Sequence, residues 1–282
     1  MVALSRNGEI DRKRVREVPG GELEGPPAEL AYAKQGFVTT IRSALCTAAF
    51  YTWAILIGTV MIPMMLLPRP IFGCFVQAWS HGNQLLLRYI TGIRVEIRGR
   101  EYIPTGAAIV ASKHQSEWES NAFLHLLHDP VYVIKKELFY VPFYGFFAMR
   151  MGMIFIDRRG HAKSLRHLVK LAQDRVAHGR PIVIFPEGTR ITPGRRAGYR
   201  PGVAALYTGL NIPVVPVVHN SGLHWPKKSF RKYSGTIILQ FLPPIPPGLP
   251  RQDFMQRLEA EMEAASARLL AECVERRKTR TA

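Results

Sequence analysis

Cysteines are scarce in this chain. Its 282 residues include three, Cys46, Cys74 and Cys273, and no two of them stand at the C-x-x-C spacing of a thiolate metal site. Cys46 and Cys74 fall in apolar segments, where a reduced cysteine behaves as a small hydrophobic side chain. The sequence therefore offers neither a disulfide framework nor a cysteine-based metal centre, and it suits a reducing compartment.

Several common catalytic signatures are also missing. The chain has no G-x-S-x-G elbow, no P-loop and no dinucleotide fingerprint, so a covalent serine mechanism has no support. His125, His128 and Asp129 lie on one predicted helix, with no further partner at ligand spacing. We expect structural roles for these three residues, and we predict no metal and no bound organic cofactor.

Acidic residues are few relative to basic ones. The chain has 38 Lys and Arg against 21 Asp and Glu, a formal net charge of +17. The excess is concentrated in residues 151–250, which carry fifteen basic residues and three acidic ones. A field of this sign attracts acidic membrane lipids and anionic substrates. We expect no nucleic-acid partner, because the basic residues are not interleaved with aromatics and no nucleic-acid-binding motif is present.

A long segment near the amino terminus lacks charge altogether. Ser43–Leu67 carries no charged residue and is long enough to cross a bilayer. A second apolar run, Ile71–Ile90, contains several polar residues. Either the first segment spans the membrane, or the two form a helical hairpin that enters one leaflet and returns; basic residues on both sides give no orientation. We expect residues 36–90 to be helical and membrane-associated, and residues 1–35 to be a flexible tail.

Beyond Ile90, short apolar runs alternate with helical patterns. The predicted strands are Ile93–Ile97, Ala107–Ser112, Val131–Ile134, Met153–Ile156, Ile182–Phe185, Val214–Val218 and Thr236–Phe241. The predicted helices are Glu117–Leu127, Val141–Arg150, His161–Ala177, Pro201–Leu210 and Arg251–Arg276. This alternation predicts an α/β domain over residues 91–282, with a largely parallel sheet flanked by helices.

A histidine and a carboxylate stand five residues apart at the end of one predicted strand. In Lys113-His114-Gln115-Ser116-Glu117-Trp118-Glu119, His114 follows the strand and Glu119 lies on the helix that begins there. That separation lets the carboxylate reach back to one ring nitrogen while the other faces a substrate. A histidine held in this way can accept a proton from a hydroxyl.

A compact anion-binding pattern follows another predicted strand. In Phe185-Pro186-Glu187-Gly188-Thr189-Arg190, the glycine relaxes the backbone, the threonine offers a hydroxyl and the arginine offers a planar fork of donors. These groups can hold a phosphate with geometric specificity. Because α/β proteins place their sites at strand ends, we expect this loop and the His114 loop to open onto one edge of the sheet.

These segments and two others resemble the glycerolipid acyltransferases, specifically the 1-acyl-sn-glycerol-3-phosphate acyltransferases. The four matching blocks, in order, are Lys113–Glu119, Gly152–Arg158, Phe185–Arg190 and Ile212–Val217, within a resemblance that covers about Ile93 to Leu242. The chain departs from the family pattern at Glu119, where the family usually has Asp; the carboxylate is kept on a stem one methylene longer.

The resemblance implies a mixed, largely parallel sheet, an N-terminal helical membrane element and transfer of a fatty acyl group. The donor would be acyl-CoA or acyl carrier protein, and the acceptor lysophosphatidic acid, giving phosphatidic acid. His114 would be the general base, supported by Glu119. Glu187, Gly188, Thr189 and Arg190 would form the phosphate site, in which Glu187 orients Arg190 or a backbone turn and Arg158 adds a charge.

Several alternatives remain open from the sequence. Lys135 and Lys136 could bind substrate phosphates, but a solvated pair is the favoured interpretation. The acceptor could instead be lyso-ornithine lipid, lysophosphatidylglycerol or glycerol-3-phosphate, and a basic, non-catalytic membrane-binding protein is the distant alternative. The expected location is a membrane, the cell inner membrane if the source is bacterial, with the catalytic domain on the cytoplasmic face.

Overall fold

The computed structural model describes residues 36–141, 143–157, 161–227 and 229–281. The predicted flexible tail, residues 1–35, and the candidate phosphate-site residue Arg158 lie outside the described residues.

A seven-stranded sheet forms the centre of the fold, in the order β1-β7-β6-β2-β5-β3-β4. The β6–β7 pair is antiparallel, and the other described neighbours are parallel, which confirms the predicted mixed, largely parallel sheet. All seven predicted strands are present. Their bounds are β1 Ile93–Arg98, β2 Ile109–Ser112, β3 Val131–Lys135, β4 Ile154–Ile156, β5 Ile182–Ile184, β6 Val214–His219 and β7 Gly235–Phe241.

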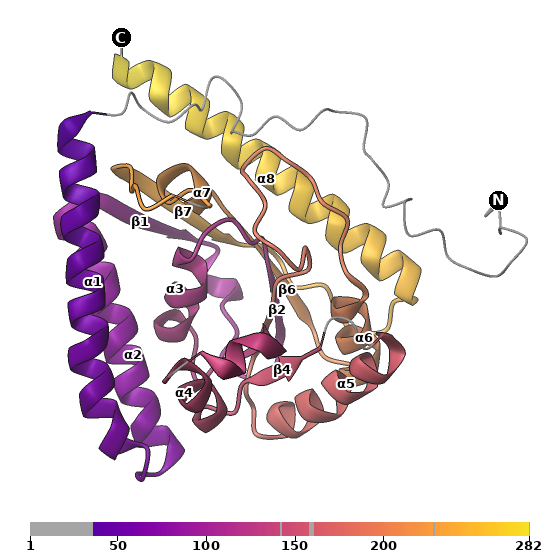
Figure 1. Ribbon diagram of the computed structural model, residues 1–282. Coiled ribbons are helices and arrows are strands. Elements are labelled where there is room, and N and C mark those ends of the chain that lie inside the picture. Colours follow the sequence, from indigo (N-terminus) through magenta and orange to yellow (C-terminus); the bar gives the residue numbers. More distant parts are fainter. Residues whose placement is uncertain (1–35, 142, 158–160, 228, 282) are drawn as a thin grey trace, which may run out of the picture.

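Helices cover both faces of the sheet (Figure 1). On one face lie α5 (His161–Ala177), α6 (Pro201–Leu210) and α8 (Arg251–Thr281). On the other lie α3 (Trp118–Leu126), the 3₁₀ helix η4 (Lys136–Tyr140) and α4 (Tyr144–Arg150). The remaining short elements are the π-helical segment Leu87–Thr91, the 3₁₀ turn Arg100–Tyr102 and α7 (Ser221–His224). Successive side chains of β2 enter opposite cores, so its continuous apolar run is buried on both faces.

The C-terminal helix α8 shows how helical periodicity produces this packing. Phe254, Leu258, Met262 and Leu269 recur at one-turn or two-turn spacing and are fully or almost fully buried. The aromatic ring of Phe254 stacks on Tyr207 of α6, with centroids 3.8 Å apart. This stripe fixes α8 against the sheet over most of its length.

The two apolar segments fold as an antiparallel hairpin, α1 (Phe37–Met64) and α2 (Arg69–Leu86), seen at the left of Figure 1. Among the described residues, α1 is the helix long and apolar enough to cross a membrane. It packs against α2 through Trp53, whose indole N–H donates to the Trp79 carbonyl at 3.1 Å. A side chain at Gly82 would collide with the same indole, so the glycine permits this close approach.

Polar contacts hold one end of the hairpin to the sheet domain. On α2, the Ser80 hydroxyl donates to the Asn121 carbonyl at 2.7 Å, and the Gln84 amide accepts the Trp118 indole N–H at 2.7 Å. On α1, the Lys232 ammonium donates to the Thr47 hydroxyl at 3.1 Å. Ser80 and Gln84, two of the polar residues in the second apolar run, therefore face α3.

Candidate active site

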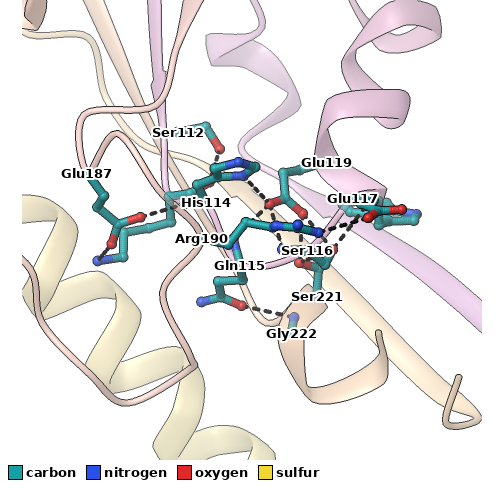
Figure 2. Close-up of polar contacts among 12 residues, drawn as sticks. Ser112, His114, Gln115, Ser116, Glu117, Glu119, Glu187, Arg190, Ser221 and Gly222 are labelled. Atoms are coloured by element: carbon teal, nitrogen blue, oxygen red, sulfur yellow. Dashed lines mark hydrogen bonds and ion pairs between the residues drawn. The ribbon is translucent and has the colours of Figure 1, made fainter. Parts of the chain in front are cut away.

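Three neighbouring parallel strands end at the site. His114 follows β2, Glu187 follows β5, and Ser221 follows β6, and β2 lies between the other two strands in the sheet. Their carboxyl ends meet at one edge of the sheet, where open α/β folds place their ligands. The predicted shared edge for the His114 and Glu187 loops is therefore confirmed, and Figure 2 shows the two loops side by side.

His114 and Glu119 are in direct contact, as their spacing predicts. The Nδ1 atom of the imidazole lies 2.8 Å from Oε1 of Glu119. The carboxylate is fully buried, whereas the imidazole side chain keeps 19 % of its surface exposed. One face of the ring stacks on Phe185, with centroids 4.2 Å apart and planes 19° from parallel. The ring is therefore held on two sides and open elsewhere.

Five donors converge on the Glu119 carboxylate. Besides His114, the backbone N–H groups of Gln115 and Ser116 donate to Oε1 at 2.7 and 2.8 Å, and the hydroxyls of Ser116 and Ser221 donate to Oε2 at 2.7 and 2.9 Å. Burial alone would raise the pKa of Glu119, but nearby His219 and these donors lower it to about 2.

The charge of Glu119 fixes the tautomer of His114. An ionised carboxylate can only accept hydrogen bonds, so Nδ1 of the imidazole carries a proton and donates it. The neutral ring therefore has its free lone pair on Nε2, away from Glu119. An imidazole in this state can accept a proton from a substrate hydroxyl at Nε2.

Sequence reasoning missed the contribution of the segment after β6. Ser221 supplies a donor to Glu119, and the buried His219 donates through Nε2 to the Lys113 carbonyl at 2.8 Å. The signal available was the apolar block Ile212–Val217, which ends two residues before His219. What it could not show is that β6 lies next to β2.

Glu187 supports the backbone of the histidine loop. Its Oε2 accepts the backbone N–H of His114 at 2.8 Å, and its Oε1 lies 2.5 Å from the ammonium of Lys113. Lys113 also pairs with Glu263 of α8 at 2.7 Å. Burial raises the pKa of Glu187, although Lys113 opposes that shift. The Glu187 carboxylate thus joins its own loop to the His114 loop. Arg190, its expected partner, pairs with Glu117 instead.

The loop Phe185–Arg190, which we call the anion loop, is more open in its remaining part. Gly188 has a φ of +68°, a left-handed conformation that other residues rarely adopt. Thr189 is exposed, and the guanidinium of Arg190 lies 2.9 Å from the carboxylate of Glu117, at the start of α3. The backbone N–H of Ile191 donates to the His114 carbonyl at 2.7 Å, which keeps the loop against His114.

An apolar cavity of about 810 Å³ reaches the histidine. Its wall combines α1, α2, α3, η4 and α4, and it includes His114, Glu117 and Phe185 at the sheet edge. Lys135 also lines it, but Lys135 and Lys136 are about half exposed and pair with Glu137 and Asp157. The solvated interpretation of these two lysines fits that geometry.

Two of the three residues considered as metal ligands, His125 and Asp129, have other partners. Asp129 pairs with Arg69 and with Arg180, and Nδ1 of His125 lies 2.9 Å from the Ser80 hydroxyl. Within the part of the chain that the structure describes, no three His, Cys, Asp or Glu side chains gather as a metal site.

Known proteins of similar sequence and structure define the class. Residues 94–220 match the family described as Acyltransferase. A 1-acyl-sn-glycerol-3-phosphate acyltransferase of Pseudomonas aeruginosa is 37 % identical over 72 % of this chain and 78 % of its own. The human 1-acyl-sn-glycerol-3-phosphate acyltransferase alpha is 29 % identical over 70 % of this chain and 71 % of its own.

A solved structure supports the fold. The crystal structure of the 1-acyl-sn-glycerophosphate (LPA) acyltransferase PlsC from Thermotoga maritima aligns with a TM-score of 0.70 and 21 % identity, over 83 % of this chain and 98 % of that one. The fold and the sequence matches together define an acyltransferase. The chain belongs to the family of its Pseudomonas aeruginosa relative, the 1-acyl-sn-glycerol-3-phosphate acyltransferases.

Proposed function

We propose that this enzyme transfers a fatty acyl group from acyl-CoA or acyl carrier protein to the sn-2 hydroxyl of 1-acyl-sn-glycerol-3-phosphate, giving phosphatidic acid for phospholipid biosynthesis. The observation that carries this proposal is the His114–Glu119 pair, 2.8 Å apart, at the end of an apolar cavity. The names of the relatives support the choice of acceptor.

His114 is the general base of the proposed mechanism. Nε2 of the imidazole removes the proton of the sn-2 hydroxyl as its oxygen attacks the thioester carbonyl. The resulting tetrahedral intermediate collapses with cleavage of the C–S bond, and the imidazolium returns the proton to the departing thiolate. Glu119 stabilises the charge that develops on the ring, because its buried carboxylate stays ionised beside Nδ1.

The anion loop is the proposed phosphate site. Arg190 and the exposed Thr189 hydroxyl bind the acceptor's phosphate, Gly188 lets the backbone approach it, and Glu187 holds the loop in place from behind. Binding exchanges the surface ion pair between Arg190 and Glu117 for contacts with the phosphate. Arg158, outside the described residues, is the proposed second cation of this site.

The apolar cavity is the proposed site of an acyl chain. Its volume of about 810 Å³ lies within the usual range of small-molecule sites, about 300–1,000 Å³. Its aliphatic and aromatic wall leads to the imidazole. An acyl chain bound in the cavity would therefore have the reacting group of its lipid, the thioester or the hydroxyl, beside Nε2.

A one-leaflet hairpin is the membrane attachment that the contacts favour. Lys232 holds α1 near Thr47, and α3 holds α2 near Ser80, so this end of the hairpin stays with the sheet domain. The opposite end also contacts the domain, through the Arg69–Asp129 ion pair, but its turn carries Leu66, which is 91 % exposed, and this turn is the part proposed to enter lipid. We therefore place residues 36–90 on the membrane and the catalytic domain, residues 91–282, on its cytoplasmic face, where acyl thioesters are made.

A thiol-release assay tests the function directly. Purified enzyme with acyl-CoA should release thiol when lysophosphatidate is added, and parallel reactions with acyl carrier protein should identify the preferred donor. A panel with lysophosphatidylglycerol, lyso-ornithine lipid and glycerol-3-phosphate tests the acceptor. Release that is as fast with another acceptor, or absent with lysophosphatidate, would contradict the proposal.

A further inference from the structure

A second apolar surface lies outside the hairpin, on η4 and α4. The sequence from Leu138 to Met149 contains no charged residue and has six aromatic residues in twelve. Most of its apolar side chains point outward: Tyr140 is 73 % exposed, Phe143 60 % and Phe146 58 %. We call the exposed apolar side chains between Leu138 and Met149 the aromatic patch. A contiguous surface of this kind on a monomer marks an interaction site.

The aromatic patch is fixed to the end of the hairpin farthest from the Lys232 contact. The Phe147 ring lies 5.8 Å from the Phe72 ring of α2, centroid to centroid. The Arg150 guanidinium donates to the carbonyls of Met65 and Leu67, at the turn between α1 and α2, with an Nε–O distance of 2.9 Å to Met65. Figure 1 shows α4 beside the lower half of the hairpin. Because of these contacts, the depth of α4 in a membrane follows from the depth of the hairpin turn.

We propose that the aromatic patch is a second lipid-binding surface, which enters the same leaflet as the hairpin turn. The proposal rests on the membrane attachment proposed above. A bilayer is the occupant because the patch and the exposed apolar face of α1, including Ile55 and Ile62, border the same cavity. Its exposed tyrosines, Tyr140 and Tyr144, suit the boundary between lipid tails and headgroups.

This surface also explains how a lipid reaches the active site. The cavity is lined by exposed side chains of α1, such as Tyr51 and Ile55, and by Phe143 and Tyr144 of the aromatic patch. Its mouth therefore has apolar margins on both sides. With both margins in lipid, the acyl chain of an acceptor passes from the bilayer to His114 without exposing its apolar surface to water.

Site-directed spin labelling tests this geometry. In a Cys74→Ser/Cys273→Ser background, which leaves the buried Cys46, single nitroxides are placed by Phe146→Cys on the patch, Ile55→Cys on α1 and Gln256→Cys on the exposed side of α8. The proteins are bound to vesicles of phosphatidylcholine and phosphatidylglycerol. Accessibility to oxygen, which concentrates in lipid, is compared with accessibility to a water-soluble nickel complex.

The expected result is lipid-like accessibility at positions 146 and 55 and water-like accessibility at position 256. Water-like accessibility at 146 with a lipid-like 55 would overturn the second surface and leave hairpin attachment standing. Low accessibility to both reagents at 146 would overturn it in favour of a protein contact, such as a second copy of the chain. Water-like accessibility at both positions would contradict the membrane attachment itself.

A kinetic comparison separates lipid contact from a structural role. Phe146→Gln/Met149→Gln removes apolar area from the patch at two residues that do not line the cavity. Its apparent KM for lysophosphatidate in vesicles should rise about tenfold, because exposed apolar area drives partitioning. With a short-chain, water-soluble acceptor its kcat/KM should match wild type. Val95→Gln, at the opposite edge of the sheet, is the matched control. Equal losses with both acceptors would overturn the proposal.

Discussion

His114 and Glu119 behave as one chemical unit, because the carboxylate fixes both the orientation and the tautomer of the imidazole. His114→Ala should reduce kcat by about 10²–10⁴-fold, the usual contribution of a positioned general base. Glu119→Gln should also be severe, since the amide cannot stabilise the imidazolium. Glu119→Asp should fall between Gln and wild type: it keeps the charge, but its shorter stem cannot meet all five donors.

The measurement is kcat for the three variants with one acceptor, together with their melting temperatures. His128→Ala, an exposed histidine outside the site, is the control and should match wild type. The partly exposed His114 contributes little to the core, so His114→Ala should melt near wild type. Near-normal turnover in His114→Ala, or a Gln variant as active as wild type, would show that acyl transfer does not use this pair.

Arg190 determines acceptor affinity if the anion loop binds the phosphate. Arg190→Ala should raise the apparent KM for lysophosphatidate by about tenfold to a hundredfold, since a charge-assisted hydrogen bond contributes about 1.5–3 kcal/mol. The KM for the thioester should change far less. Glu117→Gln is the informative companion: it frees Arg190 from its surface ion pair and should not weaken acceptor binding. A rise confined to the thioester KM would assign Arg190 to the donor instead.

At the scale of elements, the attachment of α2 to α3 should be sensitive to acid. Burial, together with the smaller effect of the neighbouring His81 on α2, lowers the pKa of His125 to about 4. The folded state therefore favours the neutral imidazole. Its contribution to stability is complete above the unfolded pKa, about 6.5, and is lost as pH falls towards 4.

His125→Gln isolates this effect, because the amide keeps polar contacts with Ser80 but does not titrate. Between pH 7.5 and 4.5, the melting temperature of the wild type should fall further than that of the variant. The two proteins should be compared in the same detergent. Parallel losses would show that other carboxylates and histidines account for the acid sensitivity.

The elements themselves were largely predictable from the sequence, because strands with two buried faces are continuous apolar runs. Helix boundaries were less so. The predicted helix Val141–Arg150 begins instead at Tyr144, since Val141 precedes a proline and is extended, with ψ 121°, and Phe143 has a φ of +61°. The helix predicted from Glu117 begins one residue later, where the Ser116 hydroxyl accepts the Trp118 N–H at 3.0 Å.

At the site, only the contacts between residues close in the sequence were predictable. A five-residue separation brings Glu119 to His114, but the ion pair between Lys113 and Glu263 joins residues 150 positions apart. Ser221 reaches Glu119 because β6 pairs with β2, which no local pattern encodes. The aromatic patch was visible as a charge-free run, but at twelve residues it is too short to span a bilayer, and its exposure depends on the tertiary packing of α4.

For the whole molecule, the apolar hairpin and the net charge of +17 contribute to membrane binding in different ways. Salt screens the attraction of basic residues for acidic lipids but not the burial of apolar surface. Full-length protein should therefore remain with membranes after a high-salt wash, and removal of residues 1–35 should change little. The assay is sedimentation and immunoblotting, with a detergent wash as the positive control for release. Solubilisation by salt alone would contradict hairpin insertion.

The reversed direction of two strands places the hairpin and His114 at the same edge of the sheet. Because β7 runs antiparallel to β6 and β1 runs parallel to β7, β1 begins at the edge where β2, β5 and β6 end. The hairpin leads into β1 through the π-helical segment and Gly92, so no long tether separates the hairpin from the sheet edge that carries His114. With the hairpin in one leaflet, as proposed above, substrate search is confined to two dimensions: the enzyme scans the plane of the leaflet, and its product diffuses away within that plane.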